Sequence, residues 1–207
     1  MTTDGIGMPR PPSYDREYAL GRAVSLFWKK GYHGSSMKQI EQALDMRPGS
    51  IYATFGSKDG LYSEALTRYA EAGGAELAEH MAGYDSVIEG LQDYLRRIAQ
   101  GCTRKGVAPS RACLIVKTLL ESSNTHAGLS EQAQAILGAI EQSFSELLEQ
   151  AREYGELKES VDPGRLARLL QSQIMGLRSI AERNLPDAEL EDLGDDMARI
   201  LDAYRAD

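Results

Sequence analysis

Residues 36–61 read SMKQIEQALDMRPGSIYATFGSKDGL, and this stretch carries the clearest structural signals in the chain. Ser36 is a good N-cap for a short helix, and Pro48 suits the first position of a second short helix. Residues 45–47, between the two helices, are spaced for a tight turn. The apolar residues fall on one face of each helix: Met37, Ile40 and Leu44 in the first, Ile51 and Phe55 in the second. The stretch therefore predicts a helix-turn-helix unit.

The rest of the chain is also predicted to be helical. Upstream, apolar residues recur at helical spacing until Gly31, a natural helix stop: Leu20, Val24, Phe27 and Trp28. Downstream, capping residues, breaks and apolar stripes predict helices over 58–81, 86–102, 110–122, 130–154, 162–184 and 187–204. Strand-like alternation and hairpin turns do not occur in the sequence. We expect an all-α fold of about nine helices without internal repeats.

This pattern divides the chain into three parts. Residues 1–12, with Gly and three Pro, are predicted to be a disordered arm. Residues 13–56 are predicted to form the helix-turn-helix domain, and residues 57–207 a regulatory and dimerisation domain. With 207 residues, of which 42% are hydrophobic, the chain can bury one substantial core or two smaller ones.

The composition is that of a cytoplasmic protein. No stretch approaches the roughly 18 apolar residues that a membrane span needs, and the first residues lack the apolar core of a signal peptide. Two cysteines are too few for a disulfide framework, which fits a reducing compartment. We therefore expect the cytoplasm and no membrane partner.

The charge distribution sets the N-terminal part apart from the rest. The net charge is −8, but residues 10–60 contain eight Lys or Arg against five Asp or Glu, a balance of +3. The remainder of the chain therefore carries −11. A mildly basic module on an acidic body is expected when one small module contacts DNA and the body positions it.

The residues of the opening stretch sharpen this expectation. Ser36-Met37-x-x-Ile40, followed by Gly49-Ser50-Ile51-Tyr52-x-x-Phe55-x-Ser57-Lys58-Asp59-x-Leu61, closely resembles the signature of the TetR family of repressors, over about residues 14–66. The resemblance implies a transcription regulator, most simply a repressor, whose third helix enters the major groove of double-stranded DNA. A two-fold dimer would then bind a palindromic operator, with half-sites about one helical turn (~34 Å) apart or more.

The resemblance also implies residue roles at matching positions. Ser36, Tyr52 and Lys58 match phosphate-contacting residues of the family, and Gly49 allows a close approach to the duplex. The full candidate set for DNA binding is Ser36, Lys38, Arg47, Gly49, Ser50, Tyr52, Ala53, Thr54 and Lys58.

Two departures from the family pattern stand in the turn. Asp45 replaces the usual Gly, and Arg47-Pro48 replaces a small polar pair. Arg47 suits either guanine or a phosphate. These departures leave open an alternative, a helical ligand-binding or interaction protein that does not bind DNA.

The last two predicted helices carry a broad apolar load, typical of a dimer interface. They run from Asp162 to Asn184 and from Asp187 to Tyr204. Their apolar residues are Leu166, Leu169, Leu170, Ile174, Leu177 and Ile180 in the first, and Leu190, Leu193, Met197, Ile200, Leu201 and Tyr204 in the second. Two such helices from each subunit would form a four-helix bundle in a homodimer. The alternative is that these faces pack within one chain.

Two candidates arise for the signal that the regulator senses. Cys113 follows Arg111 near the start of the predicted helix 110–122, where the helix dipole and the cation favour thiolate. Arg111-Ala112-Cys113-Leu114 is also similar to a segment in a family branch that responds to electrophiles and oxidants, with Cys102 as a possible resolving thiol. Alternatively, both cysteines are small core residues.

The second candidate is a pocket for an unknown small molecule, lined by residues such as Tyr69, Met81, Tyr94 and Phe144.

The sequence gives no support for an enzyme. It contains no nucleophile elbow and no Gly-rich phosphate loop, and its three histidines, His33, His80 and His126, are not paired at metal-binding spacing. We expect neither a metal nor a cofactor.

Overall fold

The computed structural model describes residues 16–103, 110–183 and 185–206, and within these ranges the fold is all-α. Its helices are α1 (Arg16–Lys30), α2 (Met37–Leu44), α3 (Pro48–Phe55), α4 (Lys58–Met81), α5 (Val87–Gly101), α6 (Leu114–Ser122), α7 (Ala127–Glu153), α8 (Pro163–Ala181) and α9 (Asp187–Ile200), followed by a short 3-10 helix (Leu201–Tyr204). The prediction of an all-α fold with about nine helices is confirmed. The predicted arm, residues 1–12, lies outside the described residues.

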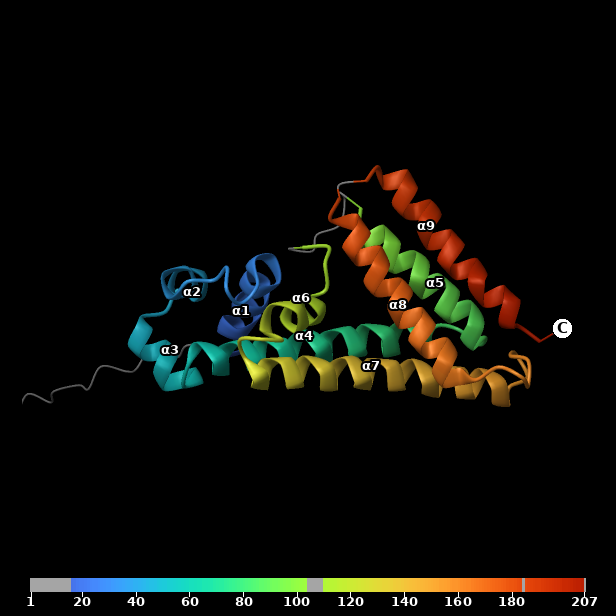
Figure 1. The fold of residues 1–207 in the computed structure, drawn as a ribbon, viewed down its shortest axis with the longest axis horizontal. Helices are drawn as coiled ribbons and strands as arrows, with labels where there is room; N and C mark the ends of the chain where they lie inside the picture. The colour runs from blue at the N-terminus through green and yellow to red at the C-terminus, as the bar shows by residue number, and fades with distance from the viewer. Residues whose placement is uncertain (1–15, 104–109, 184, 207) are drawn as a thin grey trace, which may run out of the picture.

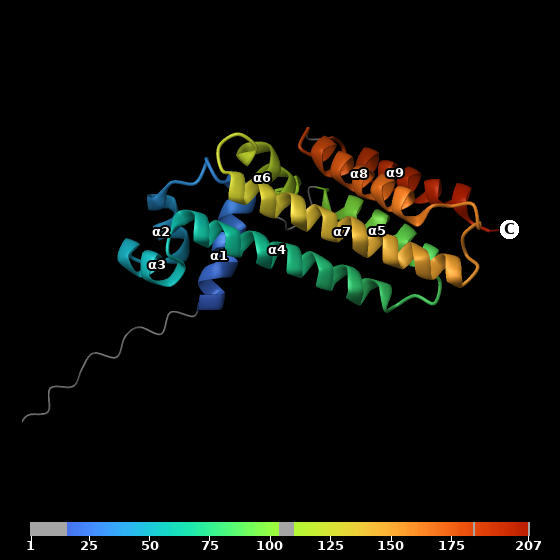
Figure 2. The same ribbon diagram turned by 60° about the horizontal axis from the view of Figure 1, so that its bottom comes forward.

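The helices form an elongated molecule with different elements at its two ends. Figure 1 shows α1, α2 and α3 at one end and α5, α8 and α9 at the other. The long helices α4 and α7 run side by side and in the same direction between the ends, as the turned view in Figure 2 also shows. The central helices α4 and α7 therefore connect the two ends of the molecule.

Two groups of buried side chains correspond to the two ends. The N-terminal cluster joins α1, α2 and α3 to the first half of α4, α6 and the start of α7, with Phe27, Ile40, Ile51, Leu61, Tyr62, Leu66, Leu114 and Ile115 among its members. The C-terminal cluster joins α5, the second half of α7, α8 and α9, with Leu91, Leu95, Phe144, Leu148, Leu170, Leu177, Leu190 and Leu201 among its members. The helix-turn-helix unit thus shares its core with the beginning of α4 and with α6.

Most helix boundaries follow local capping signals, but α6 begins later than the sequence predicts. It starts at Leu114 with Cys113 as N-cap, not at Ser110. Residues 110–112 are instead held by the end of α8, because Glu182 Oε1 accepts hydrogen bonds from Ser110 Oγ and from the Ala112 backbone N–H, both at 2.7 Å. The predicted extension of α6 was therefore wrong, and the segment before it is a strap between α6 and α8.

The apolar load of α8 and α9 is divided between the subunit core and the surface. Half of the twelve predicted interface residues are buried within the chain: Leu166, Leu170, Leu177, Leu190, Met197 and Leu201. For these six residues the structure agrees with the alternative that the apolar faces pack within one chain. The other six are exposed or only partly buried: Leu169, Ile174, Ile180, Leu193, Ile200 and Tyr204.

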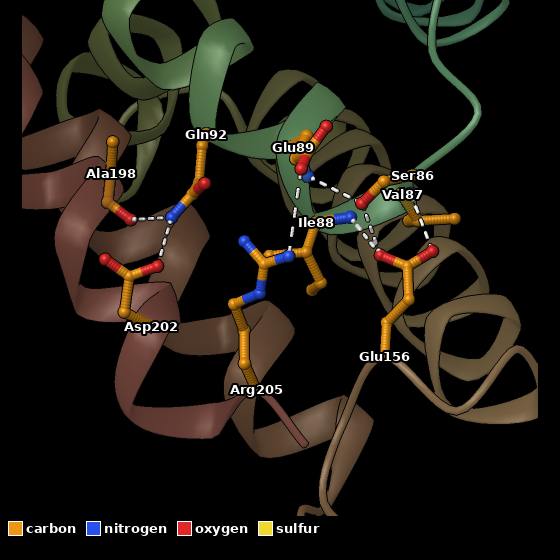
Figure 3. Close-up of polar contacts among 9 residues, drawn as sticks. All are labelled: Ser86, Val87, Ile88, Glu89, Gln92, Glu156, Ala198, Asp202 and Arg205. Carbon is orange, nitrogen blue, oxygen red and sulfur yellow. Dashed lines mark hydrogen bonds and ion pairs between the residues drawn. The ribbon is translucent and has the colours of Figure 1, made fainter. Parts of the chain in front are cut away.

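A carboxylate fixes the start of α5 against the end of α7. Glu156 accepts hydrogen bonds from Ser86 Oγ at 2.6 Å and from the backbone N–H groups of Val87 and Ile88 at 3.0 and 2.9 Å (Figure 3). These N–H groups belong to the first turn of a helix, where a negative charge is favourable. Burial alone would raise the pKa of Glu156, but these hydrogen bonds and the Arg205 charge outweigh burial and lower it.

The other side of the α5 start is held by α9 and the residues that follow it. Gln92 Nε2 donates to the Ala198 carbonyl oxygen at 3.1 Å and to Asp202 Oδ1 at 2.8 Å, and Figure 3 shows both contacts beside the Glu156 cap. These hydrogen bonds fix the position of α9 along α5.

We predict that Glu156→Gln lowers the free energy of unfolding by about 1–2 kcal/mol near pH 7, since the charged acceptor is lost. A carboxylate whose pKa is lowered by folding stabilises the fold when the pH is above its pKa in the unfolded chain, roughly 4.3. This stabilisation is lost as the pH falls through the pKa of the folded state. The difference between the variant and the wild type should therefore shrink below about pH 4. Urea unfolding as a function of pH measures this, with the exposed neighbour Glu159→Gln as control; a pH-independent difference would contradict the assignment.

Candidate DNA-binding site

The helix-turn-helix begins with a reciprocal cap. The Ser36 hydroxyl accepts from the Gln39 backbone N–H at 3.3 Å, and Gln39 Oε1 accepts from the Ser36 backbone N–H at 2.9 Å. The Ser36 hydroxyl also lies 3.2 Å from Gln39 Oε1 and is therefore engaged within the helix. Backbone N–H groups of the first turn, near the exposed Lys38, remain as donors for an anion.

The turn is built on a left-handed residue. Asp45 has φ 53° and ψ 44°, and its backbone N–H caps α2 by donating to the Glu41 carbonyl oxygen. Asp tolerates this conformation better than most residues other than Gly and Asn. The departure from Gly at this position therefore preserves the turn, and with it the placement of α3.

The candidate residues of α3 share the exposed side of the helix. Ile51 and Phe55 are buried beneath α3, as the sequence predicts. Arg47, Gly49, Tyr52, Ala53 and Thr54 are exposed, and Ser50 is partly buried. The Thr54 hydroxyl donates to the Ser50 carbonyl oxygen at 2.8 Å, so it meets a ligand as an acceptor. A Cβ added at Gly49 would meet nothing within 4 Å, so this position faces open space.

Lys58 has an internal role that the sequence did not indicate. Its Nζ donates to the Tyr32 carbonyl oxygen at 2.7 Å and lies 4.1 Å from the centre of the Tyr32 ring. Burial lowers the pKa of Lys58, although the charges of Asp59 and Glu121 act in the opposite direction. The ammonium group thus fixes the α1–α2 loop to the start of α4.

Tyr32 joins three elements at this point. Its hydroxyl donates to Asp59, and its backbone N–H donates to Glu121 Oε2 at 2.9 Å. Burial and the bond to Asp59 raise the pKa of Tyr32 to about 12. The ring also packs on His126, with ring centroids 4.5 Å apart. The helix-turn-helix unit is therefore held against both α4 and α6.

Trp28 of α1 forms a second link between the helix-turn-helix unit and the helices that follow it. Its indole N–H donates to the Ala112 carbonyl oxygen at 2.7 Å, and its ring packs edge-on against Tyr69 with centroids 4.9 Å apart. The Tyr69 side chain lies beside Cys113, and burial, followed by the neighbouring thiol, raises the pKa of Tyr69. Lys117 Nζ donates to the Trp28 carbonyl oxygen at 3.0 Å. Sequence reasoning assigned Trp28 only to an apolar stripe, because its partners are remote in sequence.

The two cysteines occupy different environments. Cys102 is buried at the end of α5, and burial raises its pKa despite the opposing charges of Arg178 and Arg111. Cys113 is partly exposed and is the N-cap of α6. Arg111 does not stand free beside the thiol, since it donates to the Ala181 carbonyl oxygen at 3.0 Å. The positive charge that acts on both cysteines is Arg178 of α8.

The described residues contain no group of three or more His, Cys, Asp or Glu arranged to hold a metal ion. His33 and His126, remote in sequence, do lie together, with ring centroids 5.5 Å apart. Among all the residues that the structure describes, no helix is long and apolar enough to cross a membrane.

A buried support beneath α3, a rigid turn and an exposed outer face define a helix-turn-helix DNA-binding protein. Residues 19–65 match the bacterial regulatory proteins of the tetR family, and residues 86–191 match the tetracyclin repressor-like C-terminal domain. The chain belongs to the TetR family of DNA-binding transcriptional repressors, whose members are dimers. The resemblance found in the sequence is thereby confirmed and extends to the regulatory domain.

Individual relatives agree with this assignment. The HTH-type transcriptional repressor ComR of Escherichia coli is 29% identical over 89% of this chain and 86% of its own length. The uncharacterized HTH-type regulator YezE of Bacillus subtilis is 27% identical over 94% of this chain and all of its own. A structure of the TetR family regulator CifR, as a cysteine mutant complexed with 26 bp operator DNA, superposes with a TM-score of 0.83 at 30% identity, covering 92% of this chain and 98% of that one.

Proposed function

We propose that this regulator represses transcription in the cytoplasm by binding a palindromic operator as a homodimer, and that a chemical signal in its regulatory domain releases it. The exposed face of α3 above buried Ile51 and Phe55 carries the proposal, because it is the surface that a major groove accepts. The name of the relative ComR and the operator complex of CifR support it. The helix-turn-helix domain corresponds to residues 13–56 and the regulatory domain to residues 57–207.

Within the DNA-binding surface, different residues serve different purposes. Tyr52 and the first turn of α2, with Lys38 and the Ser36 cap, hold phosphates and set the position of α3. Gly49 keeps the approach to the duplex open. Base choice falls to the remaining exposed positions: Arg47, Ser50, Ala53 and Thr54. Lys58, which is bonded to Tyr32, orients the domain first and reaches a phosphate only where the duplex passes close to it.

The dimer interface consists of the apolar residues of α8 and α9 that the chain does not bury. Leu169, Gly176 and Ile180 follow one another at helical spacing on α8, and Leu193, Ile200 and Tyr204 do so on α9. Ile180 and Ile200 are exposed at 36% and 37%, which leaves apolar surface for a partner to cover. Two helices from each subunit then form a four-helix bundle.

Cys113 is positioned to report a chemical change to the DNA-binding domain. Its thiol lies beside the side chain of Tyr69, which packs on Trp28 of α1. Addition of an electrophile or oxygen to the sulfur enlarges the side chain and breaks this contact. The resulting shift of α1 would alter the spacing of the two α3 helices in the dimer and so favour release. The surrounding core of the N-terminal cluster transmits such a shift because it is close-packed.

For DNA binding, we predict that Tyr52→Phe weakens operator affinity by about 1 kcal/mol per subunit, or roughly 30-fold per dimer, because a hydrogen bond to phosphate is lost. The loss should be similar on every operator variant, and the salt dependence should not change, since no charge is removed. Fluorescence anisotropy with a set of operator duplexes measures both. Tyr154→Phe, an exposed tyrosine in the regulatory domain, is the control; wild-type affinity of Tyr52→Phe would refute the role.

For the dimer, we predict that Ile180→Glu weakens self-association on the order of 100-fold or more, because a charge is buried twice in a symmetric interface. Sedimentation velocity across micromolar concentrations measures this. Leu120→Glu, at a 74% exposed position on α6, is the matched control and should stay dimeric. A monomer from Leu120→Glu but not from Ile180→Glu would place the interface elsewhere.

For the thiol signal, we predict that N-ethylmaleimide or hydrogen peroxide releases DNA from the wild type and from Cys102→Ser, but not from Cys113→Ser. Ser is the better N-cap, so Cys113→Ser should be at least as stable as the wild type. Release is followed by anisotropy, and alkylation of Cys113 by mass spectrometry. Equal release from wild type and Cys113→Ser would exclude Cys113 as the sensor.

A further inference from the structure

The middle of α4 is exposed, and Glu76 at its end is paired with Arg97 of α5. Residues 71–76 are all exposed, although a helix turns fully within 3.6 residues, so every side of α4 meets solvent here. Gly73 and Gly74 lie on the same side of the helix as buried Leu66 and Leu77, which face the core. A Cβ added at either glycine would meet nothing within 4 Å. The inward face of α4 is therefore open at this level.

The part of α7 that faces this segment of α4 also lacks fully buried residues. Gln132 Nε2 donates to the Ser63 carbonyl oxygen and to Thr67 Oγ1, both at 3.0 Å, and the two helices run in the same direction. This register places residues 71–76 of α4 level with about 137–142 of α7. No residue between Ala133 and Phe144 is fully buried, and Leu137 and Ile140 are only partly covered. The opening lies where the N-terminal cluster meets the C-terminal cluster, with Ile140 packed against both.

A cation without a partner lies at this opening. No hydrogen bond or ion pair joins the Arg178 guanidinium to any other residue in the described parts of the chain, and the side chain is partly buried. Arg178 is on the same face of α8 as Gln171, whose Nε2 donates to the Leu137 carbonyl oxygen at 2.7 Å, so this face looks onto α7. The charges that act on Arg178 come from Tyr69, Tyr94, Cys102 and Cys113, and none is a carboxylate.

We propose that the opening binds an amphipathic monoanion, a carboxylate attached to an apolar body, with Arg178 as the residue that recognises the charge. A guanidinium pairs with a carboxylate through two parallel hydrogen bonds, and the phenols of Tyr69 and Tyr94 supply further polar contacts. Leu137 and Ile140 contact the apolar body. Arg97, which also acts on Tyr94, is paired with Glu76, so Arg178 supplies the unpaired positive charge and the site suits a monoanion better than a phosphate dianion.

Binding at this site connects directly to the DNA-binding domain. Tyr69 contacts both Cys113 and Trp28, so an anion that bonds to Tyr69 and Arg178 changes the packing of α1. This consequence for DNA rests on the proposed repressor function. Binding of the anion itself does not.

The single tryptophan of the chain provides the measurement. Because Trp28 packs on Tyr69, its emission should change saturably when benzoate or octanoate is added to the full-length protein, and should not change with the neutral benzamide. Arg178→Gln should weaken benzoate binding on the order of 30-fold. Arg165→Gln, at an exposed position of the same helix, should leave it unchanged.

A second pair of variants tests the opening without removing the charge. Gly73→Leu fills the open face and improves helix propensity, so it should raise the melting temperature and abolish benzoate binding. Gly138→Leu, on the exposed side of α7 where nothing lies within 4 Å, should raise stability without affecting binding. This pair remains decisive if Arg178→Gln does not fold.

The outcomes separate this inference from the repressor function. Carboxylate binding that depends on Arg178 and on an open Gly73 supports the site, whether or not operator DNA is released. No saturable response to benzoate or octanoate at millimolar concentration, equal responses to benzamide, or unchanged binding in Gly73→Leu would overturn the inference while leaving operator binding intact. Failure of the wild type to bind any palindromic duplex would instead overturn the repressor function.

Discussion

The structure depends on the first half of α4 being buried together with α1 in one core. Leu61, Tyr62 and Leu66 of α4 pack in the same cluster as Phe27 of α1 and Ile51 of α3. The domain that faces DNA therefore has no independent core, and its orientation is tied to a helix that continues into the regulatory domain. Because of this shared core, α4 cannot tilt without moving α3. Binding of a signal in the regulatory domain and binding of DNA are thereby coupled.

Local capping signals explain which parts of this arrangement can be predicted from the sequence. Ser36, Pro48 and Ser57 act within one turn of their own helix, and α2, α3 and α4 begin where those residues predict. The exposed face of α3 follows from helical periodicity for the same reason.

Contacts between remote residues explain what the sequence does not predict. The late start of α6 depends on Glu182, about 70 residues away, and the link from Trp28 to Ala112 spans 84 residues. The sequence around Lys58 predicts an exposed cation, but the Lys58 ammonium group donates a hydrogen bond to the Tyr32 carbonyl oxygen. Likewise, the apolar stripe of α8 does not by itself show which of its residues belong to the core of the subunit; the structure places Leu166, Leu170 and Leu177 there.

The open segment of the regulatory domain is energetically unfavourable, and this bears on its role. Two glycines within α4 each cost about 1 kcal/mol relative to alanine, and a partly buried cation without an anion adds a desolvation penalty. Both costs fall at the level where the two clusters meet, next to Tyr69. The glycine cost is the same with and without a ligand, whereas an anion that pairs with Arg178 would offset the desolvation penalty of the cation. Because Tyr69 contacts Cys113 on one side and Trp28 on the other, modification of the thiol and binding of an anion would act on the same side chain. The two signals would then be alternative ways of moving α1, and each would alter the response to the other.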